Sequence, residues 1–235
     1  MSERTPSEDS ARSVQLAAVD ALDALDLLGK SLGLQISAEQ ATTLLKYLRL
    51  LQHWNITYNL TSVRDPAAMF TQHLADCLAV VPALRRHLIG GAGPQRVLDV
   101  GSGGGLPGVV LAVLMPELQV LCVDAVGKKT AFVRQVAGNF RLDNLHAAHS
   151  RVENLDVEPF PLITSRAFSS LADLVRLTRA QLLPQGAWMA MKGRLPGEEI
   201  AALPADVEVF HVEHLQVPGL DAQRCLVWMR LKVNN

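Results

Sequence analysis

The 235-residue sequence has few cysteines, few aromatic residues and almost no net charge. Its three cysteines, Cys77, Cys122 and Cys225, are an odd number, lie far apart and sit among apolar residues. This favours buried thiols in a reducing compartment over disulfides. No spacing of Cys, His and carboxylate side chains completes a zinc set, so we expect no metal site. The net charge of −1 excludes a protein that coats nucleic acid by bulk electrostatics, although it is compatible with a local basic patch.

Long apolar runs are also absent. The longest, Val109 to Met115, has seven residues, whereas a membrane-spanning helix needs roughly 20, so we expect no membrane span. The first 13 residues are polar, carry both signs of charge and lack the apolar segment of a signal peptide. We therefore interpret residues 1–13 as a disordered tail and expect the protein in the cytoplasm.

Residues 14–92 are expected to form an N-terminal helical cap. Ser37 and Gln40 fit a capping box, and an apolar stripe of leucines follows them. Asp65 begins a further helix, whose apolar residues recur at spacings of three and four up to Pro82. Because proline breaks a helix interior, we expect this helix to end there.

From residue 93 to 235 strands and helices alternate, which predicts a second domain of the α/β class. We expect strands over 95–100, 119–124, 145–149, 161–165, 186–192, 206–216 and 224–232. We expect helices over 107–115, 128–140, 169–183 and 197–202. The last two strands are joined by only "PGLDAQ" and so form an antiparallel hairpin. The predicted fold is a doubly wound, mostly parallel sheet that ends in this hairpin and carries the helical cap.

The segment "VLDVGSGGGLPG", residues 97–108, runs from a buried strand straight into a glycine cluster. Glycine tolerates positive φ and close backbone approach but costs conformational entropy on folding, so the cluster needs a reason. With the helix and the strand that follow, it makes one βαβ unit. Such a unit binds a nucleotide-like ligand outside the carboxyl end of its first strand.

Two glycine registers predict different ligands. Gly103, Gly105 and Gly108 fit G-x-G-x-x-G, which predicts a dinucleotide such as NAD(P). Gly101, Gly103 and Gly105 instead fit G-x-G-x-G directly after the strand, which is typical of S-adenosylmethionine sites. In either case Asp124 ends the second strand, where a carboxylate binds ribose hydroxyls; the alternative is that it caps the following helix.

The position of the loop favours the second register. Gly101 follows the strand with no spacer, and a turn for a cofactor should begin where the strand ends. The helix is entered through Pro107, which has no N–H to offer a pyrophosphate, whereas such donors and the helix dipole are what bind one. S-adenosylmethionine contains no phosphate and needs only close backbone approach, a ribose acid and contacts to adenine.

Six blocks, in order along the chain, carry a family resemblance. They are "WNITYNLTSVRDP" (54–66), "DVGSGGGLPG" (99–108), "DAVGKKTAFVRQV" (124–136), "SRVENL" (150–155), "SRAFSSLADL" (165–174) and "MKG" (191–193). From about residue 44 onwards the chain resembles the bacterial small-subunit ribosomal RNA guanine-N7 methyltransferases, also called glucose-inhibited division protein B. The first 30 or so residues extend beyond the resemblance, and "GGG" replaces a more usual mixed pair in the loop.

The resemblance implies a Rossmann-like methyltransferase fold and transfer of a methyl group from S-adenosyl-L-methionine to N7 of a guanine. It implies 16S rRNA or the small ribosomal subunit as partner. The cofactor contacts that it implies are Gly101, Gly103, Gly105, Leu106, Asp124, Val152, Glu153 and Arg166. Val152 and Glu153 follow the third strand, where adenine recognition belongs, although Glu153 also fits a helix start. Arg166 follows the fourth strand, where substrate chemistry belongs.

No indispensable general base is expected. "SRAF", residues 165–168, stands where amine methyltransferases carry an Asn/Asp-Pro-Pro-aromatic turn, and no cysteine nucleophile lies near it. Guanine N7 has a free lone pair, so the task is in-line positioning, for which roughly 7 to 11 kcal/mol is available. We assign Arg166 to binding of substrate or of the cofactor carboxylate, and Phe168 to stacking on the target base.

Contacts to RNA are expected from two groups of residues. Phosphates would meet basic side chains at Lys128, Lys129, Lys192 and Arg194. The mouth of the site would be lined by polar residues at Asn55, Asn59 and Thr61, for which helix capping is the alternative. Two other functions stay open: an NAD(P)-dependent oxidoreductase, and an RNA-binding ribosome-assembly factor without turnover. We expect a monomer.

Overall fold

The computed structural model describes residues 20–88, 96–166 and 168–232. The predicted tail and the predicted boundary between cap and second domain lie outside these residues. The cap contains a helix over 20–31, α2 (Ala38–Tyr58), α3 (Pro66–Met69), the π-helix η1 (Phe70–Ala75), α4 (Asp76–Leu78) and α5 (Val81–Leu88). The later helices are α6 (Gly108–Leu114), α7 (Gly127–Phe140), the 3-10 helix η2 (Val152–Asn154), α8 (Leu171–Thr178), the 3-10 helix η3 (Arg179–Gln181) and α9 (Gly197–Ala201).

The strands form one seven-stranded sheet with the order β3-β2-β1-β4-β5-β7-β6. They are β1 (Arg96–Val100), β2 (Gln119–Asp124), β3 (Leu145–His149), β4 (Phe160–Arg166), β5 (Leu182–Lys192), β6 (Val207–Leu215) and β7 (Arg224–Leu231). From β3 to β5 all pairs are parallel, and β5–β7 and β6–β7 are antiparallel. The prediction of a mostly parallel sheet ending in a hairpin is confirmed. The strand order reverses at β1, between β2 and β4, and ligands bind at such a switch point.

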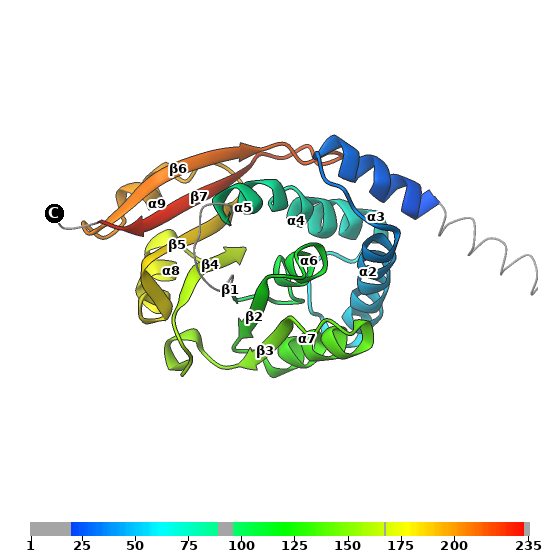
Figure 1. The fold of residues 1–235 in the computed structure, drawn as a ribbon, viewed down its shortest axis with the longest axis horizontal. Helices are drawn as coiled ribbons and strands as arrows, with labels where there is room; N and C mark the ends of the chain where they lie inside the picture. The colour runs from blue at the N-terminus through cyan, green and yellow to red at the C-terminus, as the bar shows by residue number, and fades with distance from the viewer. Residues whose placement is uncertain (1–19, 89–95, 167, 233–235) are drawn as a thin grey trace, which may run out of the picture.

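Alternation along the strands sends side chains to two hydrophobic clusters, one on each face of the sheet. Val97 and Leu98 of β1 belong to different clusters, as do Trp188 and Met189 of β5. One cluster packs against the cap, α6 and α7, and the other packs against α8. Figure 1 shows α6 and α7 on one side of the sheet and α8 and α9 on the other.

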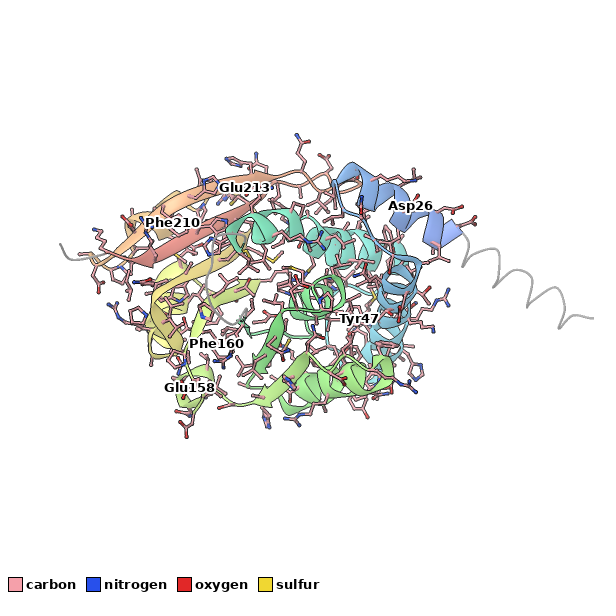
Figure 2. The ribbon with its side chains drawn as sticks, in the orientation of Figure 1. Asp26, Tyr47, Glu158, Phe160, Phe210 and Glu213 are labelled. Carbon is pink, nitrogen blue, oxygen red and sulfur yellow. The ribbon has the colours of Figure 1, made fainter. Side chains whose placement is uncertain are left out.

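The cap packs directly on the glycine loop. Tyr47 of α2 is fully buried, and its hydroxyl donates to the Gly104 carbonyl at 2.8 Å. Its side chain lies between α2 and α6 (Figure 2). Phe132 of α7 lies tilted against the Tyr47 ring, with centroids 6.1 Å apart. The cap and this face of the sheet therefore share one continuous core.

The second cap helix begins as predicted but continues differently. Asp65 is its N-cap and accepts from the Ala68 N–H at 2.7 Å. The chain then passes through η1 into α4, which ends at Leu78, a few residues before the predicted end, and Pro82 lies in the first turn of the next helix, α5. Proline is tolerated there, since an N–H in the first helical turn has no intrahelical partner to lose.

Pro66–Leu88, which comprises α3 to α5 together with η1, is long and apolar enough to cross a bilayer by composition, with a mean hydropathy of 1.3. Inside the protein, 67% of that apolar window is buried. The central helix of a globular core has the same composition as a membrane span, because both meet apolar surroundings. Cys77, Cys122 and Cys225 are buried free thiols, as the sequence predicts.

Candidate functional site

A cavity of about 360 Å³ opens at the carboxyl ends of β1, β2 and β3. Five predicted site residues line it: Gly101, Asp124, Val152, Glu153 and Phe168. The other lining residues are Val100, Val123, Ala125, Ser150, Arg151 and Leu177. The parallel strands bring these residues to the same edge of the sheet, although they span more than 50 positions in the sequence.

The glycine loop leaves open space beside its backbone. Gly101 and Gly103 adopt left-handed φ values of +67° and +59°. A Cβ added to Gly103 would meet nothing within 4 Å, and one added to Gly101 would meet only the Phe168 ring, at 3.8 Å. A ligand can therefore lie against this backbone, which a side chain would prevent.

Asp124 holds the loop and keeps capacity for a ligand. One carboxylate oxygen accepts from the Gly103 N–H at 3.0 Å, and the other accepts from the Val126 N–H at 2.9 Å. Lys129 Nζ lies 3.6 Å from the carboxylate. A carboxylate offers about four acceptor positions, so Asp124 can still accept hydrogen bonds from two ribose hydroxyls. Of the two interpretations of Asp124, the structure bears on the helix start: the carboxylate accepts from the N–H of Val126, the N-cap of α7, while its contact with ribose stays a prediction.

The start of α6 has few free N–H groups for a pyrophosphate. Pro107 has none, the Gly108 N–H donates to Asp99 Oδ2 at 2.8 Å, and the Val109 N–H donates to the Gly105 carbonyl at 2.7 Å. A pyrophosphate at a helix N-terminus depends on such donors. The geometry therefore fits a nucleoside cofactor without phosphates better than NAD(P).

Two residues that the resemblance associates with the cofactor face the core instead. Leu106 is only 3% exposed and belongs to the cluster beneath the cap. A Cβ on Gly105 would lie 2.6 Å from a Val109 methyl carbon. Gly105 and Leu106 therefore lie on the side of the loop that packs against the core and do not line the cavity.

A second cavity, of about 500 Å³, lies at the ends of β4 and β5 and beneath η1. It is lined by Thr61, Ser62, Gln72, His73, Asp76, Arg166, Met191, Lys192, Gly193 and Arg224. Arg166 and Phe168 are two residues apart yet line different cavities, Arg166 the second and Phe168 the first. The two cavities therefore adjoin the same strand end, that of β4. Phe168 lies with the cofactor candidates, not on the substrate side where stacking on a target base was expected.

Arg166 is held by one nitrogen of its guanidinium group. Nη1 donates to the Gln72 carbonyl at 3.1 Å, lies 3.4 Å from His73 Nδ1 and lies 3.6 Å from Asp76 Oδ2. Its Nε and Nη2 have no partner among the residues that the structure describes. These two donors form the edge of the guanidinium that remains for a ligand.

Of the three polar residues predicted to line the mouth of the site, two stabilise a loop and one lines a cavity. Asn55 is buried, where its side chain accepts from the Thr61 N–H at 2.8 Å and donates to the Val63 carbonyl at 3.1 Å. Asn59 is the C-cap of α2 in a left-handed conformation, with φ of 48°, and accepts from Arg64. The expectation that these asparagines line the mouth does not hold, because their amides organise the loop after α2. Thr61 does line the second cavity.

The four predicted phosphate contacts differ in exposure and in the carboxylates beside them. Lys192 has a side chain only 12% exposed and pairs with Glu199 of α9 at 2.7 Å. Lys128 and Arg194 are exposed, and Lys129 lies beside Asp124. Lys192 therefore joins β5 to α9, whereas the other three face outward or border the cofactor cavity.

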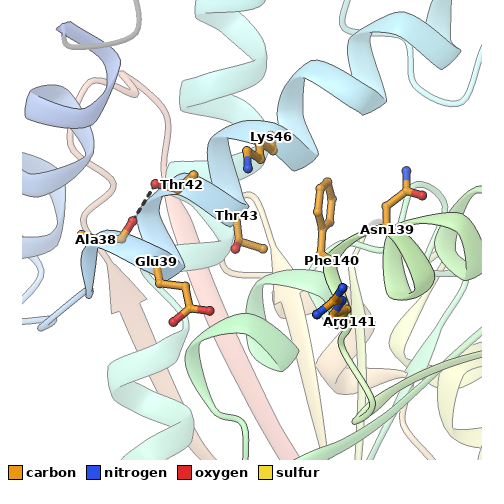
Figure 3. Close-up of a pocket in the computed structure, with 8 residues that line it drawn as sticks. All are labelled: Ala38, Glu39, Thr42, Thr43, Lys46, Asn139, Phe140 and Arg141. Atoms are coloured by element: carbon orange, nitrogen blue, oxygen red, sulfur yellow. Dashed lines mark hydrogen bonds between the residues drawn. The ribbon is translucent and has the colours of Figure 1, made fainter.

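A further hollow of about 460 Å³ lies between the start of α2 and the end of α7 (Figure 3). None of its eight lining residues belongs to the predicted site. Within residues 20–88, 96–166 and 168–232, no three His, Cys, Asp or Glu side chains gather where they could hold a metal ion.

Comparison with known families identifies the chain. The family model GidB, described as rRNA small subunit methyltransferase G, matches residues 40–227. The chain belongs to the GidB family. A relative from Leptothrix cholodnii named ribosomal RNA small subunit methyltransferase G is 60% identical over 201 residues, which cover 86% of this chain and 91% of the relative. One of the same name from Acidovorax ebreus is 57% identical, covering 85% of this chain and 91% of the relative.

Solved structures support the fold of this GidB family member. A ribosomal protein L11 methylase from Lactobacillus delbrueckii subsp. bulgaricus matches with a TM-score of 0.53 at 15% identity, covering 66% of this chain and 78% of the other. A SAM dependent methyltransferase from Aquifex aeolicus matches with a TM-score of 0.52 at 15% identity, covering 71% and 94%. At such identities the likeness concerns the methyltransferase fold alone.

Sequence reasoning missed three ionisable residues of the second cavity: His73, Asp76 and Arg224. They belong to no local motif, and Asp76 is 148 positions from its partner Arg224. The one signal was a carboxylate placed inside the apolar segment "HLADCLAVV". A charge in such a segment is buried only when it is paired.

Proposed function

We propose that the protein transfers the methyl group of S-adenosyl-L-methionine to N7 of a guanine in 16S rRNA. Membership of the GidB family supports the reaction class. The observation that carries the choice of cofactor is the open backbone at Gly101 and Gly103 beside Asp124, next to a helix start whose N–H groups are already occupied. This combination suits a nucleoside that has no phosphates.

In this proposal the first cavity holds the cofactor. Asp124 accepts the ribose hydroxyls, Glu153 and the main chain of Val152 meet adenine, and Phe168 closes the cavity from the end of β4. The glycine loop lies against the methionine part. Arg166, at the same strand end, faces the second cavity, where the substrate base would approach the cofactor.

The reaction depends on the relative position of the guanine and the cofactor more than on proton transfer. S-adenosylmethionine, when bound, would supply a methyl group on a sulfonium; guanine N7 would take it through its free lone pair, and the carbon–sulfur bond would break to leave S-adenosylhomocysteine. Burial and the neighbouring Arg166 lower the pKa of His73 to about 4, so this histidine is neutral at pH 7 and adds no charge beside the forming cation. The protein's residues then contribute orientation and exclusion of water, which is sufficient for a large rate effect.

On the substrate side, the RNA backbone is proposed to bind basic side chains near the surface. Lys128, Lys129 and Arg194 are the phosphate contacts, and Lys192 supports them through its pair with Glu199. The protein would act as a monomer in the cytoplasm, on 16S rRNA or the small subunit.

Methyl transfer from tritiated S-adenosylmethionine to small subunits from a strain lacking this modification tests the proposal. We expect tritium in 16S rRNA at one guanine, located by borohydride reduction, aniline cleavage and primer extension, which report N7-methylguanine. RNA binding without incorporation would favour the assembly factor instead. Binding of NAD(H) in place of S-adenosylmethionine would favour the oxidoreductase.

A further inference from the structure

The antiparallel β7 brings a basic residue to the substrate side of the sheet. Parallel strands place only their carboxyl ends at this edge, whereas β7 runs the other way and begins there. Cys225 is paired with Lys192 at the end of β5, so Arg224 lies just beyond that end. The hairpin thus delivers Arg224 to the cavity that already contains Arg166.

Asp76 orients both arginines. It is 4% exposed, and its Oδ1 accepts from Arg224 Nε at 2.8 Å while its Oδ2 lies 3.6 Å from Arg166 Nη1. Arg224 uses Nη1 for the Gln223 carbonyl at 2.9 Å. Its Nη2 has no partner among the described residues, as with Nε and Nη2 of Arg166. A buried carboxylate therefore holds two guanidinium groups, each with donors left over.

Thr61, which lines the same cavity, offers a neutral donor. Arg166 can only donate, so His73 Nδ1 accepts, and Nε2 carries the ring proton toward Thr61 Oγ1 at 2.8 Å. The same hydroxyl accepts from the Val63 N–H at 3.2 Å. With both acceptor positions used, the Thr61 hydroxyl has its own proton to donate into the cavity.

A guanine that is to be methylated at N7 restricts how these donors bind it. Arginine usually binds guanine through O6 and N7 together, but that contact would cover the atom that must receive the methyl group. The arginines are therefore suited to a phosphate, which they bind strongly, and a single hydroxyl is suited to O6.

We propose that this second cavity binds the target guanosine nucleotide, turned out of the RNA, with Arg224 and Arg166 on its phosphate and Thr61 on O6. The inference rests on the proposed function and names the substrate subsite for it. A volume of about 500 Å³ lies in the range of small-molecule sites. Asp76 is then a positioning residue that acts through the two arginines.

Variants of two arginines on the same strand test the subsite. Arg224→Gln removes the phosphate contact, whereas the control Arg230→Gln changes an exposed residue of β7 that pairs with Glu208 at 2.6 Å. For Arg224→Gln we expect KM for the RNA substrate to rise about tenfold or more. We expect the Kd for S-adenosylmethionine, measured by calorimetry, to stay within about twofold. Arg224→Lys should recover part of the loss, because lysine keeps the positive charge. Recovery should be incomplete, since lysine lacks the planar guanidinium that binds a phosphate through two donors.

Measuring the binding of free nucleotides tests the subsite independently of methyl transfer. The probe is guanosine 5′-monophosphate, with guanosine and adenosine 5′-monophosphate for comparison. Binding is measured by equilibrium dialysis, with each variant kept at the same interval below its own Tm. We expect tightest binding of guanosine 5′-monophosphate, weakened by Arg224→Gln and by Thr61→Val, which preserves side-chain shape. Equal binding of all three probes, or an RNA KM for Arg224→Gln equal to that of Arg230→Gln, would overturn the subsite. Retained nucleotide preference in a chain that transfers no methyl group would overturn the proposed function alone.

Discussion

At the scale of single residues, two aspartates at adjacent strand ends meet different surroundings. Asp124 is 7% exposed and accepts two backbone N–H groups beside Lys129. Asp99 is fully buried, and its Oδ1 has no partner among the described residues. Burial raises the pKa of Asp99 to about 7, although the Gly108 N–H lowers it. Asp124 lines the first cavity, which suits ligand binding, and the fully buried Asp99 supports the loop.

Asp124→Asn tests the ribose contact. The amide keeps the shape but loses the charge and one acceptor, so hydrogen bonds from ribose hydroxyls to a charged group, worth about 1.5–3 kcal/mol, should weaken. We expect the Kd for S-adenosylmethionine to rise about tenfold or more in calorimetry. Asp143→Asn, in the exposed turn before β3, is the control and should leave the Kd unchanged. An unchanged Kd in both variants would remove Asp124 from the cofactor site.

Asp99 should make stability depend on pH. Its pKa in the folded chain, about 7, lies above the unfolded value of about 4, so the native chain keeps a proton that the unfolded chain releases. The contribution of this group to the free energy of unfolding is therefore full below about pH 4. It falls as pH rises to about 7, by up to about 1.4 kcal/mol per unit, and is constant above. Asp99→Asn should remove this decline in urea titrations between pH 5 and 8. Parallel curves for the two proteins would contradict the assignment.

At the scale of elements, a π-helix and a tightly packed α-helix shape the two cavities. A π-helix shifts the hydrogen-bonding pattern of its backbone and is frequent at functional sites. Here η1 presents the Gln72 carbonyl to Arg166 at 3.1 Å. Across the glycine loop, α6 lies close against β2 because Gly108 has no side chain: a Cβ there would lie 2.4 Å from Cys122 Sγ and 2.9 Å from Asp99 Oδ2.

Two glycine-to-alanine changes in helices should therefore have opposite signs. Gly108→Ala should lower the free energy of unfolding by about 1–3 kcal/mol, because the added methyl overpacks α6 on β2. Gly138→Ala, in α7 with nothing within 4 Å of its Cβ position, should raise it by roughly 0.5–1 kcal/mol through helix propensity. Urea unfolding monitored by circular dichroism compares them. Stabilisation by both changes would show that α6 can move away from β2 at little cost.

At the scale of the whole molecule, the cap and the sheet are built on one core. Leucines of α2, residues of α4 and α5, and strand residues such as Val97 and Met189 belong to one cluster. Asp76 of the cap is also bound to Arg166 of β4 and Arg224 of β7. Covering the glycine loop with the cap buries apolar surface that the sheet would otherwise expose to water.

This shared core predicts that cap and sheet unfold together. Variants that retain one tryptophan each, Trp54 in α2 or Trp188 in β5, report on the two regions separately. We expect the same urea midpoint for both fluorescence signals when each is compared with circular dichroism of the same variant. A tryptophan signal at Trp54 that changes at clearly lower urea would show that the cap unfolds alone.

The sequence by itself determined the features that depend on neighbouring residues. The strand, glycine turn and helix at 97–115, the alternation of helices and strands, the final hairpin and the carboxylate at Asp124 all follow from local patterns of apolar residues, glycine and proline. The family blocks added the reaction class. These inferences needed no knowledge of which distant segments meet.

Only the tertiary structure decided what distant segments do together. It placed β7 rather than β6 beside β5, brought Arg224 to Asp76 across 148 positions, and turned Asn55 and Asn59 into supports of a loop. Strand order and the pairing of buried charges depend on long-range packing, because many arrangements satisfy the same local pattern, and the apolar faces and charges that pack together come from segments far apart in the sequence.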